Sequence, residues 1–192
     1  MCIICVSKQG VRQPTHFEIK TMFHNNPHGA GYMFARDGKV TIHKGFMSLK
    51  DYLYAIHSEH FTADDAVVYH FRISTQAGIS PEMTHPFPLS NQAEWMKVLD
   101  LHCPVGVAHN GIIRLTSDPW NDEYSDTALF ITRYLANIIR KPADLRNQGK
   151  LDLIWQLAQS KFALLDGDGN VTTVGKFLNH EGLLYSNESY LI

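Results

Sequence analysis

Residues 31–45, GYMFARDGKVTIHKG, carry the clearest fold signal in the chain: two strand-like runs joined by Asp-Gly at 37–38. An Asp-Gly pair between alternating segments is typical of a tight β-hairpin turn. A second signal of this kind lies in residues 162–177, FALLDGDGNVTTVGKF, with its turn at 166–169. Hairpins pair their strands antiparallel, so the sequence predicts antiparallel sheet and not a regular βαβ alternation.

Other segments predict further strands and three helices. Short apolar runs rich in β-branched residues indicate buried strands, and apolar residues at helical spacing behind Ser48 or Ser125 indicate capped helices. The expected strands cover 2–7, 66–74 and 105–115, and the expected helices cover 48–60, 125–141 and 149–161. Strands outnumber helices, so we expect an α+β fold with helices packed on antiparallel sheet, in a single domain over residues 1–192.

The composition excludes several classes of protein. The chain has 192 residues, of which 44% are hydrophobic and 19% are charged, as in ordinary globular domains. The formal net charge is -2 and no basic block is present, which argues against nucleic acid or an anionic membrane as partner. No apolar run reaches the length of a membrane span or a signal sequence. Three cysteines without framework spacing suit a reducing compartment, so we expect a cytoplasmic protein.

Cys2 lies directly behind Met1, at the head of an apolar run. Aminopeptidases remove Met1 most readily before a small residue, and this would leave a thiol and a free α-amine on one residue. Such a thiol can attack an amide carbonyl while the amine serves as base, because the ordinary pKa of an α-amine, about 7.7–8.0, lies near working pH. The alternative is that the run is only a buried strand.

The spacing of Cys2 and Cys5 could also indicate a redox pair or a zinc site. Redox pairs of this spacing begin a helix, whereas the residues here favour a strand, in which positions three apart face opposite sides. Zinc would need two further ligands, and only His102-Cys103 offers them. We therefore expect no metal site, and we expect Cys5 in the core.

Three polar segments interrupt apolar surroundings. Arg72 ends the expected strand 66–74, His85 lies before a proline, and His-Asn-Gly at 109–111 breaks the expected strand 105–115. The amide of an Asn and the N–H of the next Gly can stabilise an oxyanion, although Asn-Gly can equally form a hairpin turn. An Arg can bind a substrate carboxylate and an Asp a substrate ammonium. With an amide at the reacting end, these groups describe free glutamine or asparagine.

At these residues the chain resembles the class II glutamine amidotransferases of the N-terminal-nucleophile (Ntn) hydrolase superfamily. The match consists of short motifs that follow one another in the family's order, behind a cysteine at position 2. The motifs are NNPHGAGYMF at 25–34, RISTQAG at 72–78, THPF at 84–87, HNGII at 109–113 and YSDTALF at 124–130. Each motif is weak alone, but the ordered set favours the catalytic interpretation of Cys2.

The resemblance implies a fold and a role for each site residue. The implied fold is a four-layer αββα sandwich, with two antiparallel sheets between helical layers, and no cofactor is implied. The implied roles are nucleophile for Cys2, oxyanion hole for Asn110 and Gly111, α-carboxylate binding for Arg72, α-amine binding for Asp126, and further substrate contacts for Thr75, Gln76 and His85.

The chain also departs from the family pattern. Gln76 stands where a His is frequent, and His28 stands where other members carry an acid. The amidotransferase part occupies the whole chain, so the resemblance is to stand-alone members that would pass ammonia to a separate partner enzyme.

Two alternatives remain. One is an amidohydrolase of the same fold that acts on a γ-glutamyl or other amide; the other is a non-catalytic binding or regulatory module, if Met1 is retained.

Overall fold

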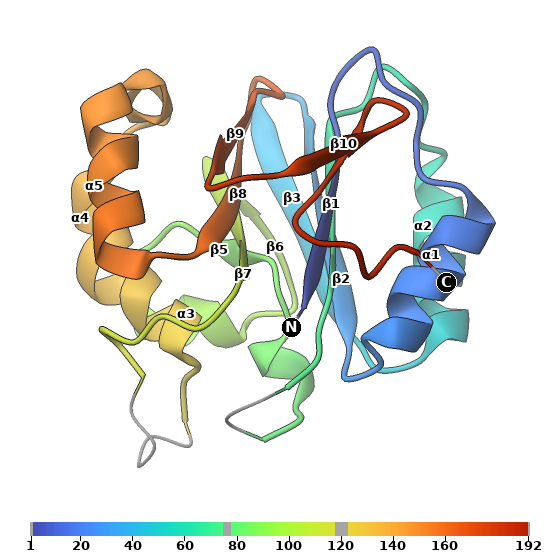
Figure 1. Cartoon of the computed structure of the whole chain (residues 1–192), viewed down its shortest axis with the longest axis horizontal. Helices are drawn as coiled ribbons and strands as arrows, with labels where there is room; N and C mark the ends of the chain where they lie inside the picture. The colour runs from blue at the N-terminus through green and yellow to red at the C-terminus, as the bar shows by residue number, and fades with distance from the viewer. Residues whose placement is uncertain (1, 75–77, 118–122, 192) are drawn as a thin grey trace.

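The computed structural model describes residues 2–74, 78–117 and 123–191, and it combines helices with two antiparallel sheets, as expected (Figure 1). Thr75 and Gln76, two of the expected substrate contacts, lie outside the described residues. Within the described ranges, no helix is both long and apolar enough to cross a membrane.

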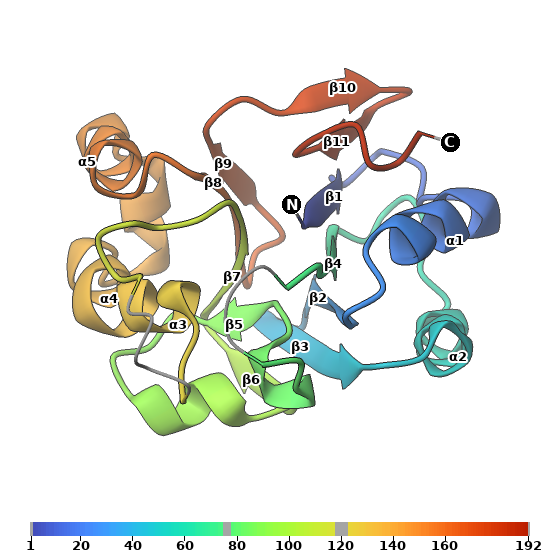
Figure 2. The same cartoon turned by 60° about the horizontal axis from the view of Figure 1, so that its bottom comes forward.

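The two sheets lie face to face at the centre of the molecule (Figures 1 and 2). The larger sheet has the strand order β10-β11-β1-β4-β2-β3-β6, and the smaller has the order β5-β7-β8-β9. The strands of the larger sheet are β1 (Ile3–Ser7), β2 (Ala30–Arg36), β3 (Lys39–Phe46), β4 (Val67–Phe71), β6 (Asp100–Cys103), β10 (Leu178–His180) and β11 (Leu183–Tyr185). Those of the smaller sheet are β5 (Phe87–Pro88), β7 (Val105–Asn110), β8 (Lys161–Asp166) and β9 (Val171–Val174).

Helices flank the pair of sheets on both outer sides (Figure 2). The larger sheet is covered by α1 (His16–Asn25) and α2 (Leu49–Glu59), and the smaller by α3 (Asp126–Phe130), α4 (Ala136–Ile138) and α5 (Gln148–Ala158). A π-helical turn joins α3 to α4, so the helix expected over 125–141 is interrupted within its length. Short 3₁₀ turns cover Pro81–Met83, Ala93–Lys97 and Pro142–Arg146.

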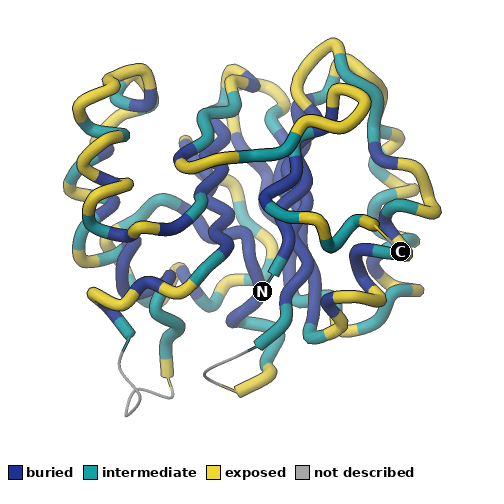
Figure 3. The backbone as a smooth tube through the Cα atoms, viewed as in Figure 1, coloured by how far each residue is buried: buried dark blue, intermediate teal, exposed yellow. Residues whose placement is uncertain are grey.

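The buried apolar residues form three clusters, one between the sheets and one under each set of helices. Strand β1 contributes to two of them: Ile3 and Cys5 face α1 and α2, whereas Ile4 and Val6 face the smaller sheet. Figure 3 shows this centre as buried and the outer sides of the helices as exposed. Because β1 is covered on both faces, its sequence is continuously apolar, and the prediction that Cys5 lies in the core is confirmed.

Most of the local predictions are confirmed. The turn at 37–38 joins β2 to β3 with left-handed φ angles of 54° and 72°, as a two-residue hairpin turn requires. The second hairpin joins β8 to β9. Ser48 and Ser125 cap α2 and α3 through their side chains.

One strand prediction was wrong, and several elements were not expected. The strand expected over 105–115 ends at Asn110, and the described residues 111–117 form no strand, so neither the long strand nor the hairpin alternative holds there. Helix α1 was not expected, although Thr15 and Glu18 form a reciprocal capping box at its start. The short strands β10 and β11 were not expected either.

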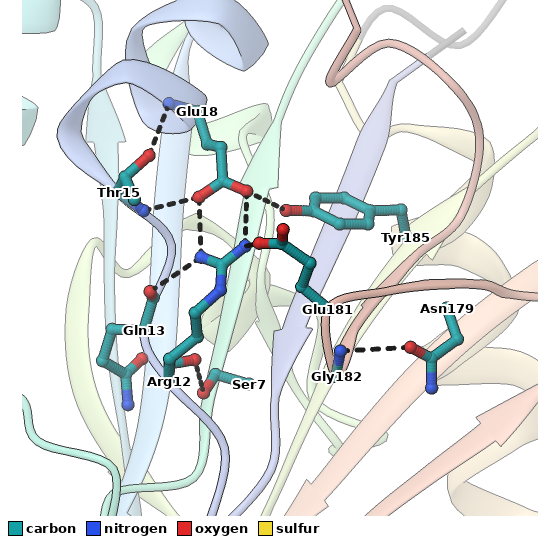
Figure 4. Close-up of polar contacts among 9 residues, drawn as sticks. All are labelled: Ser7, Arg12, Gln13, Thr15, Glu18, Asn179, Glu181, Gly182 and Tyr185. Atoms are coloured by element: carbon teal, nitrogen blue, oxygen red, sulfur yellow. Dashed lines mark hydrogen bonds and ion pairs between the residues drawn. The ribbon is translucent and has the colours of Figure 1, made fainter.

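Strands β10 and β11 form a C-terminal hairpin, and a polar network connects this hairpin to the start of α1 (Figure 4). Arg12 donates to both carboxylate oxygens of Glu18 at 2.8 Å and also contacts Glu181 at 2.8 Å. The hydroxyl of Tyr185 donates to Glu18 at 3.2 Å. The network thereby holds Glu181 and Tyr185 against the start of α1, while β11 pairs with β1. The two residues that follow β11, Ser186 and Asn187, contact Asn110 and Cys2.

Candidate active site

Cys2 and Arg72 lie side by side where β1 begins and β4 ends. The two strands are antiparallel with Ile3 opposite Phe71, which places Cys2 and Arg72 one step beyond the last pair. The Cys2 thiol donates to the carbonyl of Ile73 at 3.6 Å, and the Asn187 amide donates to the Cys2 carbonyl at 2.7 Å. Cys2 is thus held both from β4 and from the C-terminal segment.

The surroundings of Cys2 set the protonation of its thiol. Burial raises the pKa of the Cys2 thiol above its ordinary value, and the positive charge of Arg72 opposes part of that rise. The thiol is therefore protonated at neutral pH, and a nucleophilic role requires a base that removes this proton.

Arg72 is buried and holds an unused donor. Its Nη2 atom donates to the carbonyl of Gly78 at 3.2 Å and to the hydroxyl of Ser74 at 3.4 Å. Its Nη1 atom is buried and has no hydrogen-bond partner among the described residues. Burial lowers the pKa of the Arg72 guanidinium, while the nearby acids Cys2 and Asp126 raise it. A buried guanidinium with a free donor can bind a carboxylate strongly.

Asp126 begins α3 and already binds backbone groups. Its Oδ2 accepts from the N–H of Ile113 at 2.7 Å, and its Oδ1 accepts from the N–H of Thr127 at 2.8 Å. Burial raises the pKa of the Asp126 carboxyl, and the charge of Arg72 acts against this rise. Asp126 therefore connects the segment after β7 to α3, which is a structural role. Because each carboxylate oxygen can accept further hydrogen bonds, this role does not prevent the expected substrate contact.

Asn110 and Gly111 lie where β7 ends, in the smaller sheet. Asn110 is buried; its Nδ2 donates to the hydroxyl of Ser186 at 2.8 Å, and its Oδ1 has no partner among the residues described. Gly111 has a φ of +146°, and a Cβ at this position would collide with Oγ of Ser160. Only glycine fits here, because the backbone both turns to a positive φ and touches Ser160.

His85 belongs to a group of buried histidines behind these residues. Its ring stacks on that of His70 with centroids 4.3 Å apart, and both of its nitrogens lack partners in the described part of the chain. His109 bonds to the hydroxyls of Thr127 at 2.7 Å and Ser160 at 2.8 Å. Burial lowers the pKa of His70 and His109 to about 3 and that of His85 well below its ordinary value, so all three rings are neutral at pH 7.

Buried atoms without partners are concentrated here. Six buried side-chain nitrogen or oxygen atoms of the described residues lack a hydrogen bond, and five of them belong to His70, Arg72, His85 and Asn110. Interiors normally satisfy such groups. Of these residues, Arg72 lies beside Cys2, and His85 stacks on His70 of the same strand end.

The structure thus places Arg72 beside Cys2, and it places Asp126 close enough to Arg72 for each charge to act on the pKa of the other. It links Asn110 to Cys2 through the consecutive residues Ser186 and Asn187, while His85 lies against His70 of β4. Sequence reasoning missed Ser186 and Asn187, because no pattern in 185–189 links them to residues more than 70 positions away. No group of three or more His, Cys, Asp or Glu among the described residues could hold a metal ion.

Comparison of the chain with models of known protein families finds no match, and a search of curated proteins finds none.

Proposed function

We propose that this protein hydrolyses the side-chain amide of glutamine to glutamate and ammonia, with Cys2 as nucleophile. The observation that carries the proposal is that Arg72 lies beside Cys2, while Asn110 contacts Ser186, the neighbour of the Asn187 that binds Cys2. A nucleophile, an anion-binding donor and an oxyanion-stabilising amide are the groups that acyl transfer from a free amino acid requires.

The proposed reaction proceeds through a thioester. Once Met1 has been removed, the α-amine of Cys2 takes the thiol proton and the sulfur attacks the amide carbon. Asn110 and the N–H of Gly111 stabilise the resulting oxyanion. The ammonium form of the amine returns its proton to the departing nitrogen, ammonia leaves, and a water molecule then hydrolyses the thioester to glutamate.

Substrate recognition would use the two charged groups beyond the reacting centre. Arg72 would bind the α-carboxylate through its unused Nη1 donor, and Asp126 would bind the α-ammonium. The mutual electrostatic effect of Arg72 and Asp126 supports this assignment, because it indicates that the two side chains lie near each other. Thr75 and Gln76 would add further contacts.

The proposed architecture is the four-layer αββα sandwich of the Ntn hydrolases. Three separate core clusters support it, because two sheets and two helical layers create three buried interfaces. We propose a separate partner enzyme as the acceptor of the ammonia, and the cytoplasm as the place of the reaction.

The proposal is tested by assaying the purified protein for release of glutamate and ammonia from glutamine. The intact mass of the same sample shows whether Met1 has been removed. Chains that lack Met1 should release glutamate and ammonia from glutamine, and much less from asparagine, which is one methylene shorter. Release from a γ-glutamyl peptide but not from glutamine would favour the alternative amidohydrolase. No release from any of these amides, with Met1 removed, would contradict an enzymatic function.

A further inference from the structure

Ser186 lies between β1 and Asn110 and is fully buried. Its Oγ accepts a hydrogen bond from the N–H of Ile4 at 2.9 Å and contacts Nδ2 of Asn110 at 2.8 Å. It is the first residue after β11, so the C-terminal hairpin carries it to the end of β7. This serine is therefore the direct side-chain contact of the amide assigned to the oxyanion hole.

In this orientation of the Asn110 amide, one donor of Ser186 and one acceptor of Asn110 are left without a use. A serine hydroxyl has one proton to donate and two lone pairs that accept. With Nδ2 facing Ser186, both lone pairs of Oγ are used and the contact makes no use of the hydroxyl proton. On the other side of the same amide, Oδ1 of Asn110 is buried without a partner in the described ranges.

The opposite orientation of the amide gives both the Ser186 hydroxyl proton and Oδ1 of Asn110 a hydrogen-bond partner. The oxygen and nitrogen of an Asn amide are nearly alike in size, and their assignment follows from the hydrogen bonds they can make. With Oδ1 facing Ser186, the hydroxyl accepts from Ile4 and donates to Asn110. The Nδ2 group, with both of its protons, then occupies the position of the unpartnered oxygen.

We propose that Ser186 is a positioning residue: its hydroxyl donates to Oδ1 of Asn110 and thereby turns the Nδ2 protons toward the oxyanion. The assignment rests on the proposed function, since it specifies how Asn110 is held ready for the reaction. Preorganised donors of this kind stabilise an oxyanion without having to reorient during the reaction.

A purely structural role for Ser186 would rely on its backbone bonds and on the bond that its Oγ accepts from the N–H of Ile4. The N–H of Ser186 donates to the carbonyl of Ile4 at 3.0 Å, and Nζ of Lys161 donates to the Ser186 carbonyl. Both bonds survive replacement of the side chain. Ser186→Ala therefore removes the bond from the N–H of Ile4 to Oγ together with the contact to Asn110, while the backbone bond from Ser186 to Ile4 still attaches the C-terminal segment to β1.

The test is a double-mutant cycle on glutamine hydrolysis with Ser186→Ala, Asn110→Ala and the double variant. Ser186→Ala should lower kcat by at least about 10-fold with little change in KM, a part of the 10²–10³ that loss of one oxyanion donor costs. In the Asn110→Ala background the same change should have no further effect. Ser186→Cys, with similar volume and a weak donor, should give an intermediate kcat and covers the case in which Ser186→Ala does not fold.

Ser7→Ala is the matched control. Ser7 is also fully buried on β1, and its hydroxyl donates to the carbonyl of Arg12 at 2.9 Å. It should change the melting temperature without lowering kcat. An unchanged kcat in Ser186→Ala, or an undiminished loss in the Asn110→Ala background, would overturn the Ser186 assignment alone. Absence of glutamine turnover in the wild-type chain without Met1 would overturn the proposed function and this assignment together.

Discussion

The Nδ1 atom of His28 accepts a hydrogen bond from the backbone N–H of Ser74 at 2.9 Å. The N–H of His28 in turn donates to the carbonyl of Arg72 at 2.9 Å. His28 therefore fixes the two residues on either side of Ile73, whose carbonyl accepts the Cys2 thiol. A carboxylate could accept the same bond from Ser74, so a histidine in place of the acid found in the resembled family keeps an acceptor at this point.

The first prediction follows from this contact. His28→Leu removes the acceptor and should lower kcat/KM by about 10-fold or more, because the segment that carries Arg72 loses its support. His28→Asn supplies an amide oxygen near the position of Nδ1 and should retain most activity.

His24→Leu, a change at an exposed histidine of α1, is the control for loss of an imidazole. Equal activity of His28→Leu and His24→Leu would show that the contact with Ser74 has no part in the reaction.

The second prediction concerns Asn110. Asn110→Ala should lower kcat by about 10²–10³ and leave KM nearly unchanged, because a donor to the oxyanion acts in the transition state and not on the bound substrate. Steady-state kinetics with glutamine measures both values. A raised KM with unchanged kcat would instead make Asn110 a binding or turn residue.

The third prediction separates the two tasks of Asp126. Asp126→Ala leaves the N–H groups of Ile113 and Thr127 without their acceptors, and it should lower the free energy of unfolding by about 1–3 kcal/mol. If Asp126 also binds the substrate ammonium, KM for glutamine should rise sharply. Thermal melting and kinetics on the same samples distinguish the two effects.

Ser125→Ala provides the comparison, because Ser125 caps the same helix by accepting from the N–H of Ala128 at 3.2 Å. Its loss should cost about 1 kcal/mol of stability and leave KM unchanged. If Asp126→Ala behaves like Ser125→Ala in both measurements, Asp126 is structural only and the choice of substrate is open again.

The fourth prediction concerns acid stability. The hydrogen bonds from Arg12 hold the pKa of Glu18 at about 2, below the ordinary value of an unfolded chain (Figure 4). The carboxylate therefore stabilises the fold above pH about 4.5, and this contribution is lost as the pH falls toward 2. Glu18→Gln should lower the free energy of unfolding by up to about 3 kcal/mol at neutral pH. The difference in unfolding free energy between the wild type and Glu18→Gln should become smaller as the pH falls from 4.5 to 2.

Denaturant unfolding across this pH range measures the difference, with Glu94→Gln at an exposed glutamate as control. A difference between wild type and Glu18→Gln that stays constant down to pH 2 would contradict the role of the Arg12 contact.

Local chemistry made much of the fold predictable. Asp-Gly at 37–38 and the capping serines Ser48 and Ser125 act within a few residues, and each produced the expected turn or helix start. The end of β7 could not be foreseen in the same way. The apolar run after Asn110 reads as more strand, but Gly111 packs against Ser160, and Ile113 is held by Asp126. Both of these partners come from distant segments.

The candidate site likewise contains residues that the sequence predicts and residues that it does not. Its polar residues stand out because Arg72, His85 and Asn110 interrupt apolar segments. Ser186 and Asn187 do not stand out, because their importance comes from strand pairing: β11 lies beside β1 and delivers them to Cys2 and Asn110. The spacing of residues in the sequence does not indicate that β11 pairs with β1.

The proposed reaction depends on the Cys2 thiol as its nucleophile. The direct test compares the rate of ammonia and glutamate release from glutamine by Cys2→Ala with the rates of Cys5→Ala and Cys103→Ala, two buried cysteines that lie in the core. Intact mass establishes that Met1 is absent from each sample. Only Cys2→Ala should abolish turnover, while the other two variants should lose stability at most. Turnover by folded Cys2→Ala at the wild-type rate would contradict the proposed reaction.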